Sequence, residues 1–480
     1  NTTGASNTAV GANALDANTT GSINTAIGVS SMGANTTGTE NAALGRFSML
    51  ANTTGSYNVS LGSSSMQSNT EGSNNTVGGH GALSSNTTAN NNTAFGYLAL
   101  QVNTTGTQNV AVGSVALDAN TTGLDNTAVG YASLSANTTG ARNTSMNNAL
   151  GANTSGNDNT ALGHFALANS TTASNNTAVG KSALFANTTG SRNVALGTNA
   201  LDANTVGTKN IAIGVDALGA NVDGSRSVAV GDSALANQDP ASAVEMYNTA
   251  IGHGSLAANT TGTPNTALGA LALDANTTAS HNTAIGYEAL SGNETTNFNT
   301  ALGSQAAKVA QTDSLVAIGA QALVANTTGG GNTAVGRDCM GSNTTASNNT
   351  AVGKSALYAN TTGTQNVAVG SNALDSNTTA SFNTAVGYLS LSAITTASNC
   401  TAIGYGAGDT IVDGSSNIII GFQADVSSSG NSELVIGVSV VGKGDGTGFI
   451  DPPGSGNLFQ GNNSTTFAQT SDIRIKKNIV

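Results

Sequence analysis

A segment of seventeen residues is repeated along most of this chain. Its clearest early copy, "NTAVGANALDANTTGSI", begins at Asn7, and the next copy begins at Asn24. The spacing holds over long distances, because Asn7 and Asn126 are 119 residues apart, which is 7 × 17. About 26 copies follow one another, and the last begins near Glu433. A fixed period of this length indicates a solenoid or a fibrous array, in which each repeat packs mainly against its neighbours.

Within each copy, counted from its first Asn, two positions carry large apolar side chains. The fourth is nearly always Val, Ile, Leu or Phe, and the ninth is Leu or Met. Gly, Asn and Thr in between are typical of turns. We therefore expect two short strands and two corners per copy, with the fourth and ninth positions inside the coil and the sixth position in solvent. The expected core includes Val10, Leu15, Ile27, Val112, Leu117, Val352 and Leu357, and the expected exposed residues include Arg46 and Lys354.

Stacking of such copies predicts an all-β fold, a parallel β-solenoid or β-roll of about 26 seventeen-residue coils. A helix is disfavoured because Gly and Thr-Thr interrupt most copies. A collagen helix would need Gly at every third residue, which the chain lacks. A disordered chain would not keep a strict apolar period.

Composition excludes several functions. The formal net charge is −12, from 25 acidic and 13 basic residues, and no basic patch is present, so we expect no nucleic-acid binding. No apolar run is long enough to span a bilayer, so we expect no membrane insertion. Cys339 and Cys400 occupy different positions of the repeat, and we expect both to be free thiols. No dinucleotide-binding, P-loop or hydrolase motif occurs, and we expect neither an enzyme nor a cofactor.

Asparagine recurs at the first and twelfth positions of most copies, as at Asn103 and Asn120. Stacked at the strand spacing of roughly 4.8 Å, these side chains would form amide ladders. The alternative is N-glycosylation, because "NTT" is an acceptor pattern. We favour the ladders, because the motif recurs at one fixed corner and no secretory signal is seen.

Departures from the period mark expected boundaries. The copy from Asn143 is one residue short, and the copy from Ser227 has four extra residues that we expect to form a loop. The pattern weakens after Cys400, and Pro452 and its neighbour suggest a stop. We expect a repeat shaft over 1–437, a neck or cap over 438–471, and the start of a further domain over 472–480. Because the sequence opens inside a repeat, we expect it to be a piece or a processed product of a longer chain.

The sixth position offers the candidate ligand sites. His80, His164 and His253 share it, but Arg and Lys do too, so we favour a solvated corner and expect no metal site. Tyrosines in the same column would suit sugar stacking, or be ordinary surface aromatics. A glycine-rich segment around Asp445 has too few carboxylates for a calcium site.

The "NTAVG…AL" copies resemble the head repeats of YadA-type trimeric autotransporter adhesins over roughly Asn7 to Gly437. That resemblance implies a left-handed parallel β-roll assembled as a homotrimer. The unit of that family is usually shorter than the one here, because the "NTTG" corner is additional.

The final segment "SDIRIKKNIV", from Ser471 to Val480, looks like the start of the intramolecular chaperone domain of phage tail spikes and fibres. In that family the domain aligns three chains and is released by self-cleavage at a Ser-Asp bond. The resemblance implies that Ser471 and Asp472 form that bond, that Lys476 assists the serine, and that Arg474 belongs to the same motif. A chance charged tail is the alternative.

Together these features predict the shaft of a homotrimeric viral tail or host-attachment fibre, matured by self-cleavage. A bacterial surface trimeric adhesin, or an extracellular filament without a receptor, are the alternatives. The expected partners are two further copies of the chain and a cell-surface glycan or receptor. The expected location is the virion, or the cell surface and extracellular space.

Overall fold

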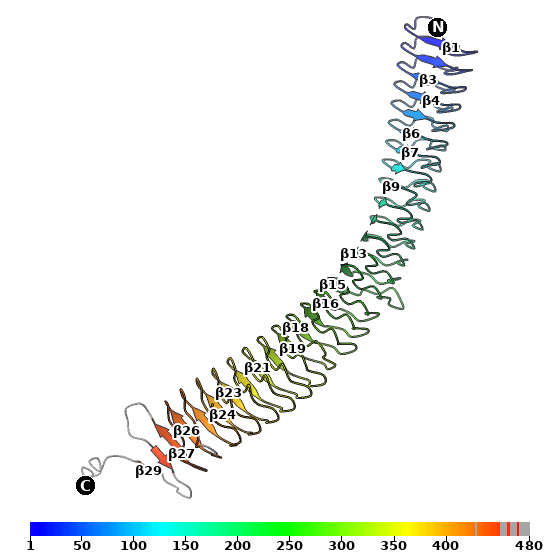
Figure 1. The fold of residues 1–480 in the computed structure, drawn as a ribbon. Coiled ribbons are helices and arrows are strands. Elements are labelled where there is room, and N and C mark those ends of the chain that lie inside the picture. Colours follow the sequence, from blue (N-terminus) through cyan, green and yellow to red (C-terminus); the bar gives the residue numbers. More distant parts are fainter. Residues whose placement is uncertain (428–429, 452–457, 461–467, 470–480) are drawn as a thin grey trace. The chain divides into compact units, whose positions relative to one another are not determined.

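The computed structural model describes residues 1–427, 430–451, 458–460 and 468–469. These residues form strands and turns, with no helix among them. The chain divides into two compact units, Asn1–Tyr247 and Asn248–Val480. In each unit the strands follow one another in register like the rungs of a ladder (Figure 1).

The first unit contains fourteen strands, and each pairs in parallel with the next. The register joins equivalent positions of neighbouring copies, as in Thr8↔Thr25 and Ala9↔Ala26. The strands are β1 (Thr8–Val10), β2 (Thr25–Ile27), β3 (Ala42–Leu44), β4 (Val59–Leu61), β5 (Thr76–Gly78), β6 (Thr93–Phe95), β7 (Val110–Val112), β8 (Thr127–Val129), β9 (Thr144–Met146), β10 (Thr160–Leu162), β11 (Thr177–Val179), β12 (Val194–Leu196), β13 (Ile211–Ile213) and β14 (Val228–Val230).

The second unit continues the same pattern. Parallel pairing runs from β15 to β27, one strand beyond residue 437, and β28 and β29 then pair antiparallel. The strands are β15 (Thr249–Ile251), β16 (Thr266–Leu268), β17 (Thr283–Ile285), β18 (Thr300–Leu302), β19 (Val316–Ile318), β20 (Thr333–Val335), β21 (Thr350–Val352), β22 (Val367–Val369), β23 (Thr384–Val386), β24 (Thr401–Ile403), β25 (Ile418–Ile420), β26 (Leu434–Gly437), β27 (Gly448–Asp451), β28 (Leu458–Gln460) and β29 (Ala468–Gln469). The predicted parallel β-solenoid is therefore confirmed, with β1 to β26 giving one strand per copy.

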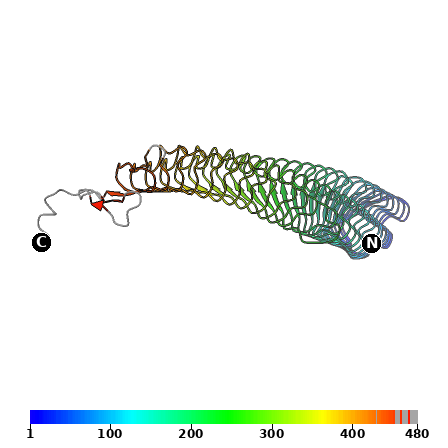
Figure 2. The same ribbon diagram turned by 90° about the horizontal axis from the view of Figure 1, so that it is seen from below.

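Each coil holds one strand of three residues, at the second to fourth positions, and the remainder is turns (Figure 2). The expectation of a second strand at the ninth position is wrong. In the coil of β7, Val115 and Leu117 have φ values of 51° and 53°, in the left-handed region, which an extended strand excludes. Gly113 turns the chain with φ 137°, and a Cβ there would lie 2.4 Å from the Gly130 carbonyl oxygen of the next coil.

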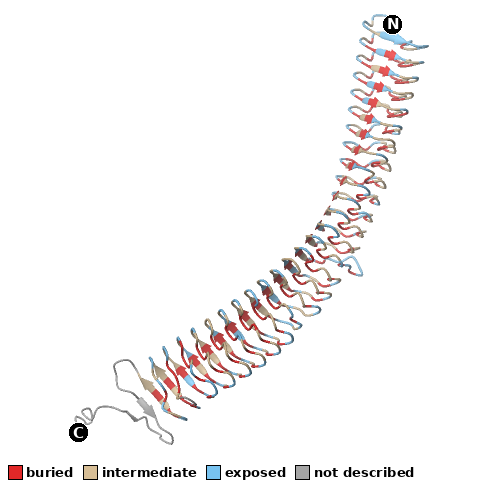
Figure 3. Ribbon diagram, in the orientation of Figure 1, coloured by how far each residue is buried: buried red, intermediate tan, exposed pale blue. Residues whose placement is uncertain are grey.

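The core is thin and lies inside the turns. Ala111, Ala116 and Leu117, at the third, eighth and ninth positions, are fully buried. Burial of the ninth position is confirmed, also at Leu15 and Leu357. Burial of the fourth position is wrong, because its side chain is on the outer face of the strand. The exposed fractions are 56% for Val10, 37% for Ile27, 38% for Val112 and 38% for Val352. Figure 3 shows the strands with a buried middle. Arg46 and Lys354 are exposed, as expected.

The predicted amide ladders are present. At the twelfth position Asn120 donates from Nδ2 to Asn103 Oδ1 at 2.8 Å and to the Gly123 carbonyl at 3.0 Å. At the first position the backbone N–H of Asn126 donates to Asn109 Oδ1 at 3.0 Å, linking successive coils. These side chains are buried, so the folded coil does not present them to a glycosylating enzyme.

The irregular copies keep the stack intact. In the short coil of β9, Asn147 and Asn148 both take left-handed conformations, with φ of 64° and 56°. The ladder passes through this coil, since Asn153 Nδ2 donates to Asn137 Oδ1 at 2.9 Å. In the copy from Ser227, which is four residues longer than the period, residues 241–245 are exposed and form the expected loop, and Gln238 continues the ladder.

A later irregularity is compensated by packing. Gly408 replaces the ninth-position Leu, and a Cβ there would lie 2.7 Å from Leu391 Cδ2 and 3.0 Å from Ile419 Cδ1. Ile411 also reaches this space and is buried. Larger aliphatic side chains at other positions therefore fill the volume that the missing leucine leaves.

Candidate functional site

The main candidate for an interaction site is the outer surface of the strands. We call the second- and fourth-position side chains of β1 to β26 the strand face. The third-position side chain points into the coil, so its two neighbours point out of it. In β7 these are Val110 and Val112, on either side of the buried Ala111.

The strand face carries no charge over β1 to β26 and is apolar at its fourth position. Its second position is Thr in most copies and otherwise Val, Ile, Ala or Leu, and its fourth is Val, Ile, Leu, Met, Phe or, once, Gly. Leu44 and Leu61 in the first unit are 47% and 43% exposed, and Leu268 in the second unit is 44% exposed. Parallel sheets normally have both faces covered, so a long uncovered apolar face is unusual.

One pair of residues keeps the strand face level. Gly78 leaves a gap in the fourth-position column, and Phe95 of the next strand fills it. A Cβ at Gly78 would lie 2.6 Å from Cδ1 and Cε1 of the Phe95 ring. The ring therefore lies across the glycine and restores the surface that an aliphatic side chain would otherwise provide.

Two exposed corners border the strand face. We call the seventeenth position of the preceding copy the leading edge, and the sixth position the trailing edge. In the coil of β3 these are Glu40 and Arg46, and both are exposed. The two edges of a coil are six residues apart across an extended strand, roughly 15–20 Å.

Aromatic side chains form short stacks on the trailing edge of the second unit. The ring centroids of Tyr388 and Tyr405 are 5.2 Å apart, and those of Tyr405 and Phe422 are 5.1 Å apart. The interplanar angles are 28° and 16°. Rings at this spacing cover each other's faces, so within the stack they offer edges rather than the open faces on which sugars stack.

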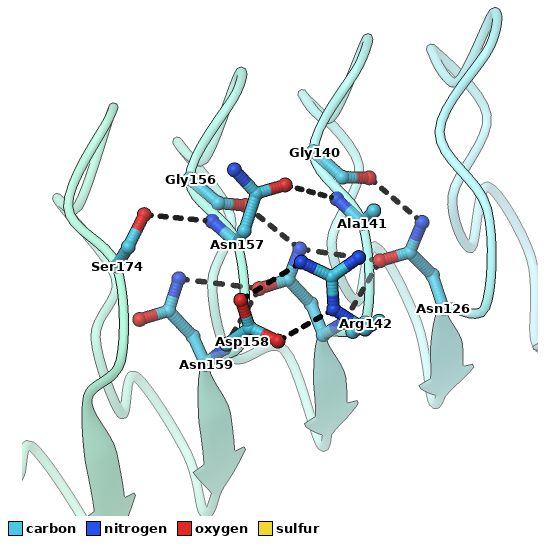
Figure 4. A network of polar contacts seen from close by, with 10 residues as sticks. Asn126, Gly140, Ala141, Arg142, Gly156, Asn157, Asp158, Asn159 and Ser174 are labelled. Atoms are coloured by element: carbon cyan, nitrogen blue, oxygen red, sulfur yellow. Dashed lines mark hydrogen bonds and ion pairs between the residues drawn. The ribbon is translucent and has the colours of Figure 1, made fainter.

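Ion pairs along the corners link adjacent coils of one chain. Arg142 Nε and Asp158 Oδ1 are 2.6 Å apart on the leading edge (Figure 4), and this pairing lowers the pKa of the Asp158 carboxyl. In the second unit Lys308 Nζ lies 2.6 Å from Glu288 Oε2. Hydrogen bonds from Lys308, Gln305 and Tyr287 lower the pKa of Glu288 to about 2.

Aspartates occupy the tenth position of several copies, directly after the ninth-position residue. Desolvation raises the pKa of four of them, although backbone N–H groups partly offset it. These four lie in separate coils, at Asp118, Asp202, Asp274 and Asp375. No group of three metal-ligating side chains occurs among the described residues, so these aspartates do not form a metal site.

The predicted ligand positions are not brought together. His80 stacks on Tyr97, with centroids 5.7 Å apart, rather than meeting other histidines. Asp445 accepts a hydrogen bond from the Asn431 backbone at 2.8 Å. Cys339 and Cys400 are buried free thiols, as expected, and burial raises the pKa of Cys339 to about 12. The predicted cleavage residues Ser471, Asp472, Arg474 and Lys476 lie outside the described residues.

Sequence reasoning missed the strand face because it placed the fourth position inside the coil. The signal was present at the third position, which is Ala or Ser in nearly every copy between larger neighbours. A position restricted to small residues indicates a narrow interior, and the larger residues beside it must then face outward.

The fold defines the class of protein: a parallel β-solenoid with one strand per coil and an uncovered apolar strand face. No protein-family model, no curated protein and no solved structure matches the chain significantly. In the described part of the chain, no helix has the length and hydrophobicity needed to cross a bilayer.

Proposed function

We propose that this chain is the structural shaft of a homotrimeric attachment fibre, most specifically a viral tail fibre. The observation that carries the proposal is the strand face, which is uncharged and apolar in both units. A solenoid that leaves such a face open in a single chain gains stability when other chains cover it. The number of chains in the proposed fibre, three, is taken from the resemblance to YadA-type repeats.

The virus assignment depends on the C-terminal segment. In the proposed maturation, a chaperone domain beginning at Asp472 aligns the chains and is then released. Ser471 acts as the nucleophile, and Lys476 serves as its base. A serine needs such a base, and a lysine can serve when its pKa is lowered by its surroundings. The only enzymatic step in the proposal is this single self-cleavage.

Two alternatives share the same shaft. A bacterial surface adhesin would use it to hold a binding domain away from the cell, and a receptor-free filament would use it for its mechanical properties alone. For the viral fibre and for the bacterial adhesin, the external partner is a cell-surface glycan or receptor. The stacked rings on the trailing edge expose edges, so they support a structural role better than sugar binding.

An antibody against the exposed loop 241–245 distinguishes the three cases. Immunogold labelling is applied to the source culture, its virus particles and its cell-free filaments. We expect gold on thin appendages of virus particles. Labelling of bacterial surfaces in a virus-free culture would favour the adhesin, and labelling of free filaments alone would favour the third case. An unrelated solenoid antibody provides the control for non-specific adhesion.

A further inference from the structure

We propose that copies of this chain associate side by side, parallel and without stagger, through the strand face. In this arrangement the leading edge of one chain lies against the trailing edge of its neighbour at the same coil. The proposal deepens the proposed function: it takes the number of chains from that function and assigns the contact surface and its register.

The first step is that the strand face is large enough for a stable contact. A fully exposed Val or Leu side chain presents roughly 60–120 Å² of apolar surface. At up to about two-fifths exposure, the fourth-position residues of the first unit offer at most roughly 350–700 Å². That approaches the roughly 800 Å² per partner of a standard specific interface. Single soluble chains rarely leave a patch of this size open.

The second step is that the face is shaped for a solid partner. The ring of Phe95 fills the gap at Gly78 and keeps the column level. Water fills a gap in an exposed surface whatever its shape. A protein surface packed against the same gap does not fill it, so a cavity remains where a side chain is missing. Because the ring keeps the column level, a second surface can lie against these strands without leaving a cavity at Gly78.

The third step identifies the partner as the same chain. A partner that follows this face must repeat its own side chains at one strand spacing, roughly 4.8 Å. A second copy of the chain has the same period because it has the same sequence, and its strand face carries the same apolar side chains. Electrostatics do not oppose the contact, because the strand face of β1 to β26 carries no charge in either copy.

The fourth step gives the direction. In a closed ring of parallel chains, rotation about an axis along the solenoid brings each leading edge to a neighbour's trailing edge. An antiparallel pair would instead place leading edge against leading edge. Two coils carry complementary residues on their two edges: the opposite charges Glu40 and Arg46 in the coil of β3, and the aromatic rings Phe382 and Tyr388 in the coil of β23. Within one chain the two residues of each pair lie on opposite sides of the strand, so they can meet only if a second chain lies alongside.

Charges along the edges disfavour stagger in one direction. Only the coils of β3 and β14 carry charge on both edges, and in each coil the two charges have opposite signs. A shift by one coil in one direction places Lys181 against Arg192, which is repulsive. A shift in the other direction separates Glu40 from Arg46 but brings Lys181 to Asp158, so charge alone does not oppose it, and the crosslinking test below decides between that shift and the unshifted arrangement.

The test is crosslinking between chains expressed from the whole gene. Glu40→Cys is combined with Arg46→Cys in one chain, and a thiol crosslinker too short to span the strand is added. We expect loss of the single-chain band and appearance of covalent multimers. Glu40→Cys with Ser63→Cys, and Glu40→Cys with Val29→Cys, are matched controls that sample a stagger of one coil in each direction. Cys339 and Cys400 are buried and do not interfere.

A second variant pair tests the face itself. Val112→Lys places a charge on the strand face, and we expect loss of multimers by native mass spectrometry with an unchanged circular dichroism spectrum. Thr122→Lys, at the exposed fourteenth position of the same copy, lies outside the strand face and both edges and should assemble normally. Single chains from the unsubstituted protein, normal assembly of Val112→Lys, or stronger crosslinking in an offset control would overturn the proposal. These outcomes are separate from the labelling experiment, which alone decides whether the assembly belongs to a virus.

Discussion

The assignment of the two strand faces leads to a sharp prediction at Ala111 and Val112. These neighbours in β7 point in opposite directions, and both can be enlarged to leucine. Ala111 is fully buried, whereas Val112 is 38% exposed. Ala111→Leu forces three extra carbons into a closed interior, which destabilises by about 1–3 kcal/mol. Val112→Leu adds one carbon to a column that already contains Leu44 and Leu61, so its effect stays within about 0.5 kcal/mol.

Hydrogen exchange measured by mass spectrometry suits this comparison, because a solenoid opens locally and has no single unfolding equilibrium. A loss of 1–3 kcal/mol corresponds to roughly 5–150-fold faster exchange. We expect that acceleration for Ala111→Leu in peptides from the coils of β6, β7 and β8, and almost none for Val112→Leu. Coils far away, such as that of β2, serve as the internal control. Equal acceleration in both variants, or a larger effect of Val112→Leu, would refute the face assignment.

Three further predictions follow from individual contacts. Asn120→Ala removes the bonds that Asn120 donates to Asn103 and to the Gly123 carbonyl and the bond that it accepts from Asn137, so we expect a local loss of about 1–3 kcal/mol, measured by exchange in the same coils. The pKa of Glu288 is depressed to about 2, so its contribution to stability is present above its unfolded pKa near 4.5 and is lost as pH falls towards 2; Lys308→Met should raise the pKa in an NMR titration, and an unchanged value would contradict the pairing. Ser471→Ala should abolish cleavage of the full-length precursor while leaving the multimer intact, as read by mass spectrometry of the C-terminus.

Much of the fold follows from the period of the sequence alone. Parallel stacking, one copy per coil, the buried ninth position and the amide ladders all follow from the spacing of Leu117, Asn120 and their equivalents. These features depend on stacking identical positions, and a fixed repeat length dictates that stacking. The antiparallel pairing of β28 with β27 lies beyond the last copy of the repeat, so the period could not predict it.

The missing second strand has a different cause. Val115 and Leu117 adopt left-handed backbone conformations that cost aliphatic residues roughly 1–2 kcal/mol each. Local preference opposes that conformation, so a sequence argument based on preference assigns an extended strand instead. The coil imposes it because the leucine must turn inward directly after the Gly113 corner. Burial of the whole side chain, worth roughly 1.5–3 kcal/mol, offsets the backbone cost.

The same regularity that builds the shaft leaves its register weakly defined. A slip of one coil between chains preserves nearly every contact of the strand face, because all fourth positions are alike. Only sparse features change, such as the edge pair Glu40 and Arg46 or the filled gap at Gly78. Exposed ion pairs contribute about 0.2–1 kcal/mol each, too little to correct a slipped assembly that already buries a large apolar face. Alignment must therefore precede stacking. A domain that joins the chains at one end would align them before they stack, and this is the physical argument for the chaperone domain that we propose.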